Sequence, residues 1–159
     1  MTKPPHTPDF YTEKDGMRQA FDRAAQQYDA AAVLQREVSN RMAERLDYIK
    51  HAPQRILDAG AGTGYGARAL LARYPKADLI ALDIALGMLQ ACMRIAPSQR
   101  SLAQLRSWLR PHTRITPLCS DIEAIALADA SVDMIWSNLT VQWCNEPDTA
   151  FKEFHRVLQ

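Results

Sequence analysis

The stretch Arg55-Ile-Leu-Asp-Ala-Gly-Ala-Gly-Thr-Gly64 decides the fold. A short, mostly apolar run typical of a buried strand leads into three alternating glycines, and a helical pattern follows them. Glycine has no Cβ and accepts positive φ, so such a turn brings backbone N–H groups close to a ligand. Nucleotide-like ligands bind at these turns, beyond the carboxyl ends of parallel strands. A tight turn without a ligand is the alternative, but three alternating glycines exceed what a turn requires.

Strand and helix patterns alternate from this loop onward. We predict four strands, at residues 55–59, 79–83, 115–120 and 132–137. Helices are expected among and after them, at about 65–74, 86–95, 101–109 and from 147. This alternation predicts a parallel sheet with crossover helices. Pro117 lies within the third strand, and because proline cannot donate a ladder hydrogen bond, that strand should lie at an edge of the sheet.

Two helices are predicted ahead of the first strand. Apolar residues recur at steps of three and four between residues 17 and 28. A second amphipathic helix is expected to end before Pro53, with one apolar face made of Leu34, Val38, Met42, Leu46 and Ile49. We expect residues 1–15, which are rich in proline, to form a flexible tail, and residues 16–159 to form one domain.

Composition excludes several classes of protein. The chain has 159 residues, of which 47% are hydrophobic and 23% charged, as in a globular domain. Its 19 Lys and Arg against 18 Asp and Glu give a net charge of +1, so no overall charge favours nucleic acid or an anionic membrane. No apolar run approaches the ~20 residues that span a bilayer. The three cysteines form no C-x-x-C pair, so we expect reduced thiols, no metal site and a cytoplasmic location.

The spacing of the glycine loop distinguishes between ligand classes. A phosphate-binding P-loop requires a lysine, and none lies near residues 60–66. A dinucleotide fingerprint starting at Gly60 requires a glycine at position 65, which is occupied by Tyr65. A nucleotide-dependent oxidoreductase is therefore a secondary hypothesis.

Acidic residues at the strand ends narrow the choice of ligand. Asp58 precedes the glycines, where it suits a cationic amino group and so favours an amino-acid nucleoside. Asp83 closes the second strand, where we expect it to accept from ribose hydroxyls, unless it only caps the next helix. Asp121 ends the third strand, where it either accepts a hydrogen bond from the adenine amino group or caps the turn at Glu123. Three apolar side chains are expected to sandwich the adenine ring: Ile84, Met88 and Ile122.

Together these motifs resemble the class I S-adenosylmethionine-dependent methyltransferases. The resemblance spans about residues 20–159, including Ser120-Asp121-Ile122 as the adenine motif and 133–138 as the fourth strand. It implies a Rossmann-like α/β fold with parallel strands in order 3-2-1-4, flanking helices and S-adenosyl-L-methionine as cofactor. The cofactor-binding residues it implies are Asp58, Gly60, Ala61, Gly62, Asp83, Ile84, Met88, Asp121, Ile122 and Asn138.

A narrower resemblance lies in residues 20–38 and in Ser137-Asn-Leu-Thr-Val-Gln-Trp143. Both look like the BioC-type malonyl-acyl-carrier-protein O-methyltransferases of biotin synthesis. This implies methyl transfer to the free malonyl carboxylate, which needs no general base, with an acyl-carrier protein as partner. Tyr28 lies on a helix that resembles the family's lid and is our candidate for shaping the methyl site, or else a packed aromatic residue. Gln35 and Arg36 either reach the cofactor's carboxylate or lie on a solvated face.

The connection before the third strand carries basic side chains that suit an acidic carrier protein, or alternatively a solvated helix: Arg94, Arg100, Arg106, Arg110, His112 and Arg114. The family fold resembles a seven-stranded sheet, so we expect this chain, which ends at Gln159, to stop before strand five. The open edge of strand four then favours self-association. A noncatalytic cofactor-binding module and a methyltransferase acting on another small molecule are the alternative functions.

Overall fold

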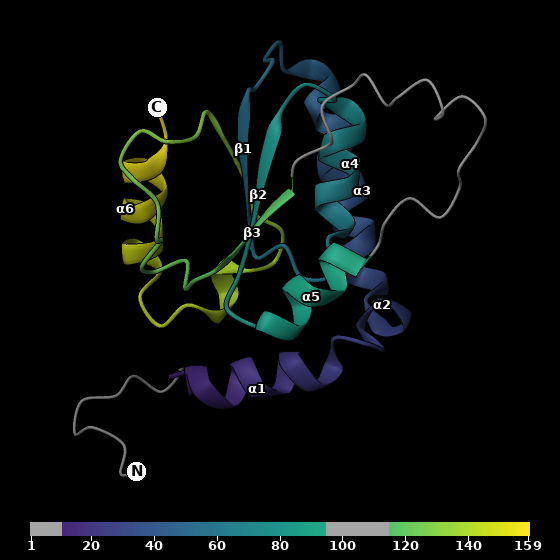
Figure 1. Cartoon of the computed structure of the whole chain (residues 1–159), viewed down its shortest axis with the longest axis vertical. Helices are drawn as coiled ribbons and strands as arrows, with labels where there is room; N and C mark the ends of the chain where they lie inside the picture. The colour runs from purple at the N-terminus through teal and green to yellow at the C-terminus, as the bar shows by residue number, and fades with distance from the viewer. Residues whose placement is uncertain (1–10, 95–114) are drawn as a thin grey trace.

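The computed structural model describes residues 11–94 and 115–159. Its elements, in chain order, are α1 (Lys14–Ala24), α2 (Tyr28–Ala31), α3 (Val33–Arg45), η1 (Leu46–Tyr48), β1 (Arg55–Ala59), α4 (Tyr65–Arg73), β2 (Asp78–Asp83), α5 (Leu86–Arg94), β3 (Ile115–Cys119), β4 (Met134–Trp136), η3 (Val141–Trp143) and α6 (Pro147–Val157). The strands form one sheet in the order β3-β2-β1-β4, and Figure 1 shows helices on both of its faces. The predicted fold class and strand order are confirmed.

All three strand pairings are parallel. In the register, Ile56 lies beside Leu79 on one side and beside Met134 on the other, while Pro117 lies opposite Ala81. Strand β3 pairs only with β2 among the described residues, so the proline lies on an edge strand as predicted. Because parallel strands share one direction, the loops that follow β1, β2 and β4 meet at the same end of the sheet.

The core lies on both faces of the sheet. On one face, Ile56 and Leu79 are fully buried and pack with residues of α4, including Leu70. On the other, Leu57 and Leu82 are fully buried and pack with residues from α6 and the segment before it. Figure 1 shows α3 and α4 on one side of the sheet and α6 on the opposite side. Strands buried on both faces are typical of parallel sheets, and they make β1 and β2 a rigid support.

The structure differs from the sequence expectations at several boundaries. Helix α3 ends at Arg45, and both Leu34 (64% exposed) and Ile49 (55% exposed) lie outside the core, so the predicted apolar face is wrong at its two ends. Strand β4 has three residues, because Val132 instead pairs with Leu158 in an isolated bridge. Helix α1 begins at Lys14, within the range expected to be a tail. The helix expected at 101–109, and the basic residues of that segment beyond Arg94, lie outside the described residues.

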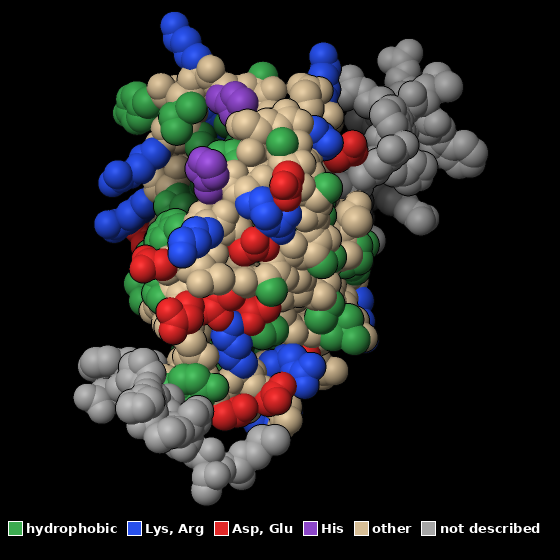
Figure 2. All heavy atoms as spheres, turned by 90° about the vertical axis from the view of Figure 1, so that its left-hand side faces the viewer, with side chains coloured by type: hydrophobic (Ala, Val, Ile, Leu, Met, Phe, Trp, Pro, Cys, Tyr) green, Lys and Arg blue, Asp and Glu red, His purple; other side chains and the backbone are tan. Residues whose placement is uncertain are grey.

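The surface of the described residues carries no dominant charge on the face that Figure 2 shows. Acidic and basic side chains are interspersed on this face, which is the side of the molecule that carries α6. In the described ranges, no helix has the length and apolar character required to cross a membrane.

Candidate functional site

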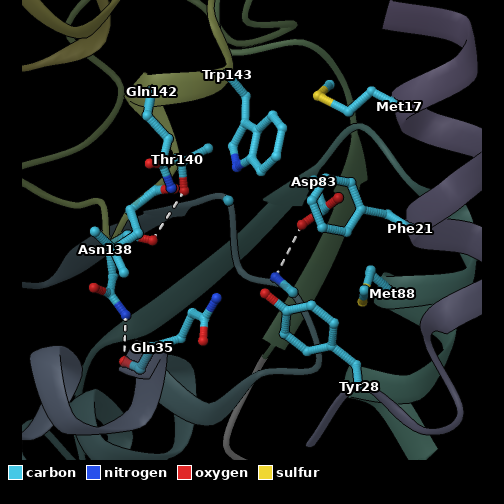
Figure 3. Close-up of a pocket in the computed structure, with 13 residues that line it drawn as sticks. Met17, Phe21, Tyr28, Gln35, Asp83, Met88, Asn138, Thr140, Gln142 and Trp143 are labelled. Atoms are coloured by element: carbon cyan, nitrogen blue, oxygen red, sulfur yellow. Dashed lines mark hydrogen bonds between the residues drawn. The ribbon is translucent and has the colours of Figure 1, made fainter. Parts of the chain in front are cut away.

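Two adjoining cavities lie at the end of the sheet where the loops meet. The larger has a volume of about 170 Å³ and the smaller about 60 Å³. Figure 3 shows the larger one, which is lined by Met17, Phe21, Tyr28, Gln35, Gly60, Gly62, Asp83, Met88, Asn138, Leu139, Thr140, Gln142 and Trp143. Five residues line both cavities: Tyr28, Gln35, Gly60, Gly62 and Asn138. The two hollows therefore form one continuous candidate site.

The glycine loop forms the part of the site that follows β1. Gly60, Gly62 and Gly64 have φ values of +87°, +54° and +85°. A Cβ at Gly60 would lie only 1.9 Å from Oγ1 of Thr140, so glycine is required there for space as well as for φ. The N–H groups of Gly60 and Ala61 both donate to the Leu82 carbonyl at 2.8 Å, which joins the loop to β2.

Asp83 lies where β2 ends and lines the larger cavity. One carboxylate oxygen accepts from the N–H of Gly62 at 2.9 Å and the other from the N–H of Ala85 at 2.8 Å. Burial raises the pKa of Asp83, although these backbone N–H groups act to lower it. The Ala85 contact is the helix-capping contact we considered as the alternative, and it leaves the carboxylate facing the cavity. The ribose role stays a prediction.

Asp58 is the most deeply buried carboxylate of the site. Its side chain is 2% exposed and lines the smaller cavity, and its Oδ2 has no hydrogen-bond partner among the described residues. Burial, with the nearby charge of Asp83, raises the pKa of Asp58 to about 7, although a backbone hydrogen bond from Ala67 acts to lower it. Trp136, its neighbour across the β1–β4 ladder, likewise has an unpartnered Nε1. A buried acceptor without a partner is costly, so this position favours a polar ligand that carries a donor.

The segment after β4 forms another wall. The Asn138 side chain donates from Nδ2 to the Gln35 carbonyl at 2.9 Å, while its Oδ1 is buried without a partner in the described residues. Leu139 has a φ of +55°, a left-handed conformation that is unfavourable for leucine and is found most often at functional sites. The contact to Gln35 joins this segment to α3, so the wall depends on residues far apart in the sequence.

Aromatic side chains close the larger cavity. Figure 3 shows Phe21, Tyr28 and Trp143 around it, from α1, α2 and η3. Phe21 meets Trp143 edge-on, with ring centroids 5.5 Å apart and an interplanar angle of 90°, and its centroid lies 6.2 Å from that of Tyr28. Burial and the charges of Asp83 and Asp29 raise the pKa of Tyr28, so its hydroxyl stays protonated and able to donate. These rings give the site an apolar, water-excluding side.

The structure brings together most of the residues predicted from the sequence. The cavities are lined by Tyr28, Asp58, Gly60, Ala61, Gly62, Asp83, Met88 and Asn138. Ile84, Asp121 and Ile122 line neither cavity. Asp121 forms an ion pair with Lys14 and accepts from the N–H of Glu123 at 3.0 Å, which is the turn-capping alternative, and Ile122 is buried in the core. The adenine roles stay predictions.

Sequence reasoning missed six residues of the smaller cavity: Asp29, Ala32, Thr63, Tyr65, Gly66 and Trp136. It also missed six residues of the larger cavity: Met17, Phe21, Leu139, Thr140, Gln142 and Trp143. The helical periodicity of residues 17–28 and the motif at 137–143 both contained these residues, but neither pattern indicates that the two segments meet. Gln35 lines both cavities, and Arg36 lines the smaller one. Arg36 donates from its guanidinium to the Asp29 carbonyl, and contact of Gln35 or Arg36 with the cofactor's carboxylate stays a prediction.

Comparison with known proteins identifies the family. A family model described as a methyltransferase domain matches residues 57–159. The chain belongs to this methyltransferase family. S-adenosyl-L-methionine is the cofactor of the family, as the resemblance implied. Asp58, whose buried Oδ2 has no partner within residues 11–94 and 115–159, fits the amino group of that cofactor.

The curated relatives include malonyl-[acyl-carrier protein] O-methyltransferases. The protein from Gallionella capsiferriformans is 53% identical over 95% of this chain and 50% of its own length. The protein from Laribacter hongkongensis is 53% identical over 94% of this chain and 49% of its own length. The chain thus spans about half the length of the curated relatives it matches.

Solved structures share the fold. A putative S-adenosyl-L-methionine-dependent methyltransferase from Methanococcus maripaludis superposes with a TM-score of 0.62 at 22% identity, covering 100% of this chain and 63% of that protein. The putative methyltransferase in complex with the Trm112 activator of Haloferax volcanii gives a TM-score of 0.66 at 22% identity, covering 87% and 55%. The class I architecture predicted from the sequence is confirmed.

Proposed function

We propose that this methyltransferase domain binds S-adenosyl-L-methionine and serves methyl transfer to the free carboxyl of malonyl-acyl-carrier protein, in biotin synthesis. The observation that carries the proposal is Asp58, whose buried Oδ2 lies beside the glycine loop and lacks a partner in the part of the chain that the structure describes. A cationic amino group satisfies that acceptor and stabilises its charge, whereas a pyrophosphate would repel it. The relatives, malonyl-[acyl-carrier protein] O-methyltransferases, supply the acceptor class.

The site residues divide among the parts of the cofactor. Asp58 would hold the amino group, Asp83 the ribose hydroxyls, and the backbone of residues 60–62 would lie against the nucleoside. We retain four residues for the adenine ring in this proposal, although only Met88 lines a cavity: Ile84, Met88, Asp121 and Ile122. When bound, the cofactor supplies a methyl group that its sulfonium has already activated.

The chain's own contribution is alignment and exclusion of water. A carboxylate acceptor is already deprotonated, so no side chain has to remove a proton. Phe21, Trp143 and Met17 give the larger cavity an apolar wall, and the protonated Tyr28 hydroxyl can donate to an anionic acceptor. Proximity of this kind can contribute about 7 to 11 kcal/mol to lowering a barrier. Tyr28 is accordingly our candidate for shaping the methyl site.

The proposal also covers partners and location. An acyl-carrier protein bearing malonyl is the expected partner, and neither nucleic acid nor membrane is. A cytoplasmic location agrees with three free cysteines, Cys92, Cys119 and Cys144, since reducing compartments keep thiols unpaired. We also retain self-association along β4 as a proposal, because in the described residues this strand has only β1 as a sheet neighbour.

Calorimetry with S-adenosylhomocysteine, adenosine and NAD tests the cofactor. We expect S-adenosylhomocysteine to bind more tightly than adenosine, because adenosine lacks the amino group that Asp58 would hold. NAD binding without S-adenosylhomocysteine binding would instead support an oxidoreductase. Methyl-ester formation on malonyl-acyl-carrier protein tests the acceptor, and cofactor binding without any ester would favour a noncatalytic module or another small-molecule acceptor.

A further inference from the structure

Helix α1 covers the larger cavity without belonging to the core. None of its residues is buried, yet Met17 and Phe21 line the cavity. Figure 1 shows α1 lying across the end of the molecule near α5, apart from the sheet. Phe21 packs against a small buried cluster of Ala25, Ala85 and Met88. Because no side chain of α1 is itself fully buried, the hydrophobic effect contributes little more, and polar contacts add to what fixes the position of the helix.

The start of α1 carries the strongest of these contacts. Lys14 forms ion pairs with both Asp121 and Glu123, which follow β3 more than a hundred residues later in the chain. The three side chains are 25%, 27% and 11% exposed, so solvent screens these pairs less than it screens surface pairs.

A second pair of contacts lies beside Lys14. The N–H of Thr12 donates to Oδ1 of Asn145 at 2.7 Å, and Nδ2 of Asn145 donates back to the Thr12 carbonyl at 3.0 Å. Further along α1, the Asp22 carboxylate accepts from the N–H of Gly87 at 2.6 Å. The start of α1 is therefore joined to the segments that follow β3 and η3, and its last turn to the start of α5.

We propose that Lys14 is a positioning residue: by bridging Asp121 and Glu123 it holds α1 closed over the nucleoside cavity and thereby slows release of the ligand. The proposal rests on the proposed function, because the ligand it retains is the nucleoside of that site. Lys14 also separates two carboxylates that would otherwise repel each other with no cation between them. Its loss should free the start of α1 and withdraw Phe21 from Trp143.

The experiment measures dissociation of S-adenosylhomocysteine from the full chain by stopped flow, with tryptophan fluorescence as the signal. We expect Lys14→Met to speed dissociation about fivefold, at the low end of the usual coupling between sites. Lys14→Arg should restore slow release, since a guanidinium also spans two carboxylates. Arg18→Met is the matched control: Arg18 lies on the same helix, pairs with the exposed Asp15, and should leave the rate unchanged.

The dependence of the dissociation rate on salt gives a second measurement. Wild-type dissociation should become faster as salt screens the Lys14 pairs, and Lys14→Met should lose most of that dependence. Wild-type kinetics and salt dependence in a folded Lys14→Met variant would overturn the positioning role. Failure of the wild-type chain to bind S-adenosylhomocysteine would instead count against the proposed function, so the two failures are distinguishable.

Discussion

Two regions face each other across the larger cavity, and they are held in place by different forces. The floor, residues 58–64 with Asp83, continues directly from β1 and β2, whose Leu57 and Leu82 are fully buried. The cover, residues 14–24 with 138–143, includes a helix without one buried residue. The floor is therefore preformed by the core, while polar and aromatic contacts hold the cover. A ligand enclosed between them enters and leaves by movement of the cover, the region of lower local stability.

The largest expected effect is at Gly60, in the floor. Gly60→Ala should abolish S-adenosylhomocysteine binding and destabilise the fold by about 3 kcal/mol or more, because the new Cβ meets Thr140 and the φ is unfavourable. Gly62→Ala is the matched control, since its φ is also positive but its Cβ would meet nothing within 4 Å. We expect it to lose only about 1 kcal/mol of unfolding free energy. Equal losses in the two variants, measured by thermal unfolding, would contradict a floor defined by close approach.

Replacing Asp58 should have the next largest effect, and it should change ligand affinity and unfolding free energy in opposite directions. Asp58→Asn should weaken S-adenosylhomocysteine binding by about 1.5 to 3 kcal/mol, the contribution of a hydrogen bond to a charged group, and leave adenosine binding unchanged. The same variant should raise the unfolding free energy, because it removes a buried charge with an unpartnered oxygen. Calorimetry and denaturant unfolding measure the two effects. If Asp58→Asn weakened the binding of S-adenosylhomocysteine and of adenosine equally, Asp58 would not hold the amino group.

The raised pKa of Asp58 also predicts a dependence on pH. Below a pH of about 7 the folded protein protonates this carboxyl, so S-adenosylhomocysteine affinity should fall about fivefold between pH 7 and pH 6. The stability of the ligand-free protein depends on pH in the opposite direction. The folded state binds more protons than the unfolded state between about pH 4 and pH 7, so the Asp58 contribution to unfolding free energy decreases as the pH rises through that range. Asp58→Asn should remove both dependences.

Asp83 should have a smaller effect that extends to both ligands. Asn at this position keeps one acceptor oxygen, so Asp83→Asn should cost about 1 to 2 kcal/mol of affinity. The loss should be the same for S-adenosylhomocysteine and adenosine, since both carry the ribose. Asp83→Asn should also lower the melting temperature, because the Asp83 carboxylate accepts hydrogen bonds from two backbone N–H groups. If the melting temperature fell while both affinities stayed unchanged, Asp83 would cap the helix without binding the ribose.

The floor could be predicted from the sequence because local patterns determine it. The bounds of β1, Arg55–Ala59, agree with the predicted strand, and the alternating glycines permit the positive φ values that the loop adopts. Asp58 and Asp83 follow from the same reasoning, since parallel neighbours bring their carboxyl ends together. Each of these inferences uses residues that are close in sequence or joined by one strand pairing.

The cover could not be predicted, because its contacts join residues far apart in the chain. Periodicity places Phe21 on a helix but does not indicate that it meets Trp143. Asp121 is the clearest case: its position at a strand end suggested adenine, and only the structure shows Lys14 beside it. Leu139 carries no sequence signal for its left-handed backbone, since glycine or asparagine is usual there.

The smallest expected effect is in the cover, at Phe21, and it tests whether the two regions are as independent as their packing indicates. Phe21→Leu keeps an apolar side chain but loses the edge-on contacts with Trp143 and Tyr28, each worth about 0.5 to 1.5 kcal/mol. Because Phe21 is only partly buried, and packs against the small cluster of Ala25, Ala85 and Met88 rather than against the sheet, the melting temperature should change little. Release of S-adenosylhomocysteine should become faster while its association rate stays similar, since loss of a closing contact acts mainly on dissociation. Met17→Leu, also on α1 and lining the same cavity, removes no aromatic ring and provides the comparison. A large fall in melting temperature for Phe21→Leu would mean that the cover is part of the folding core, and the contrast between the two regions would not hold.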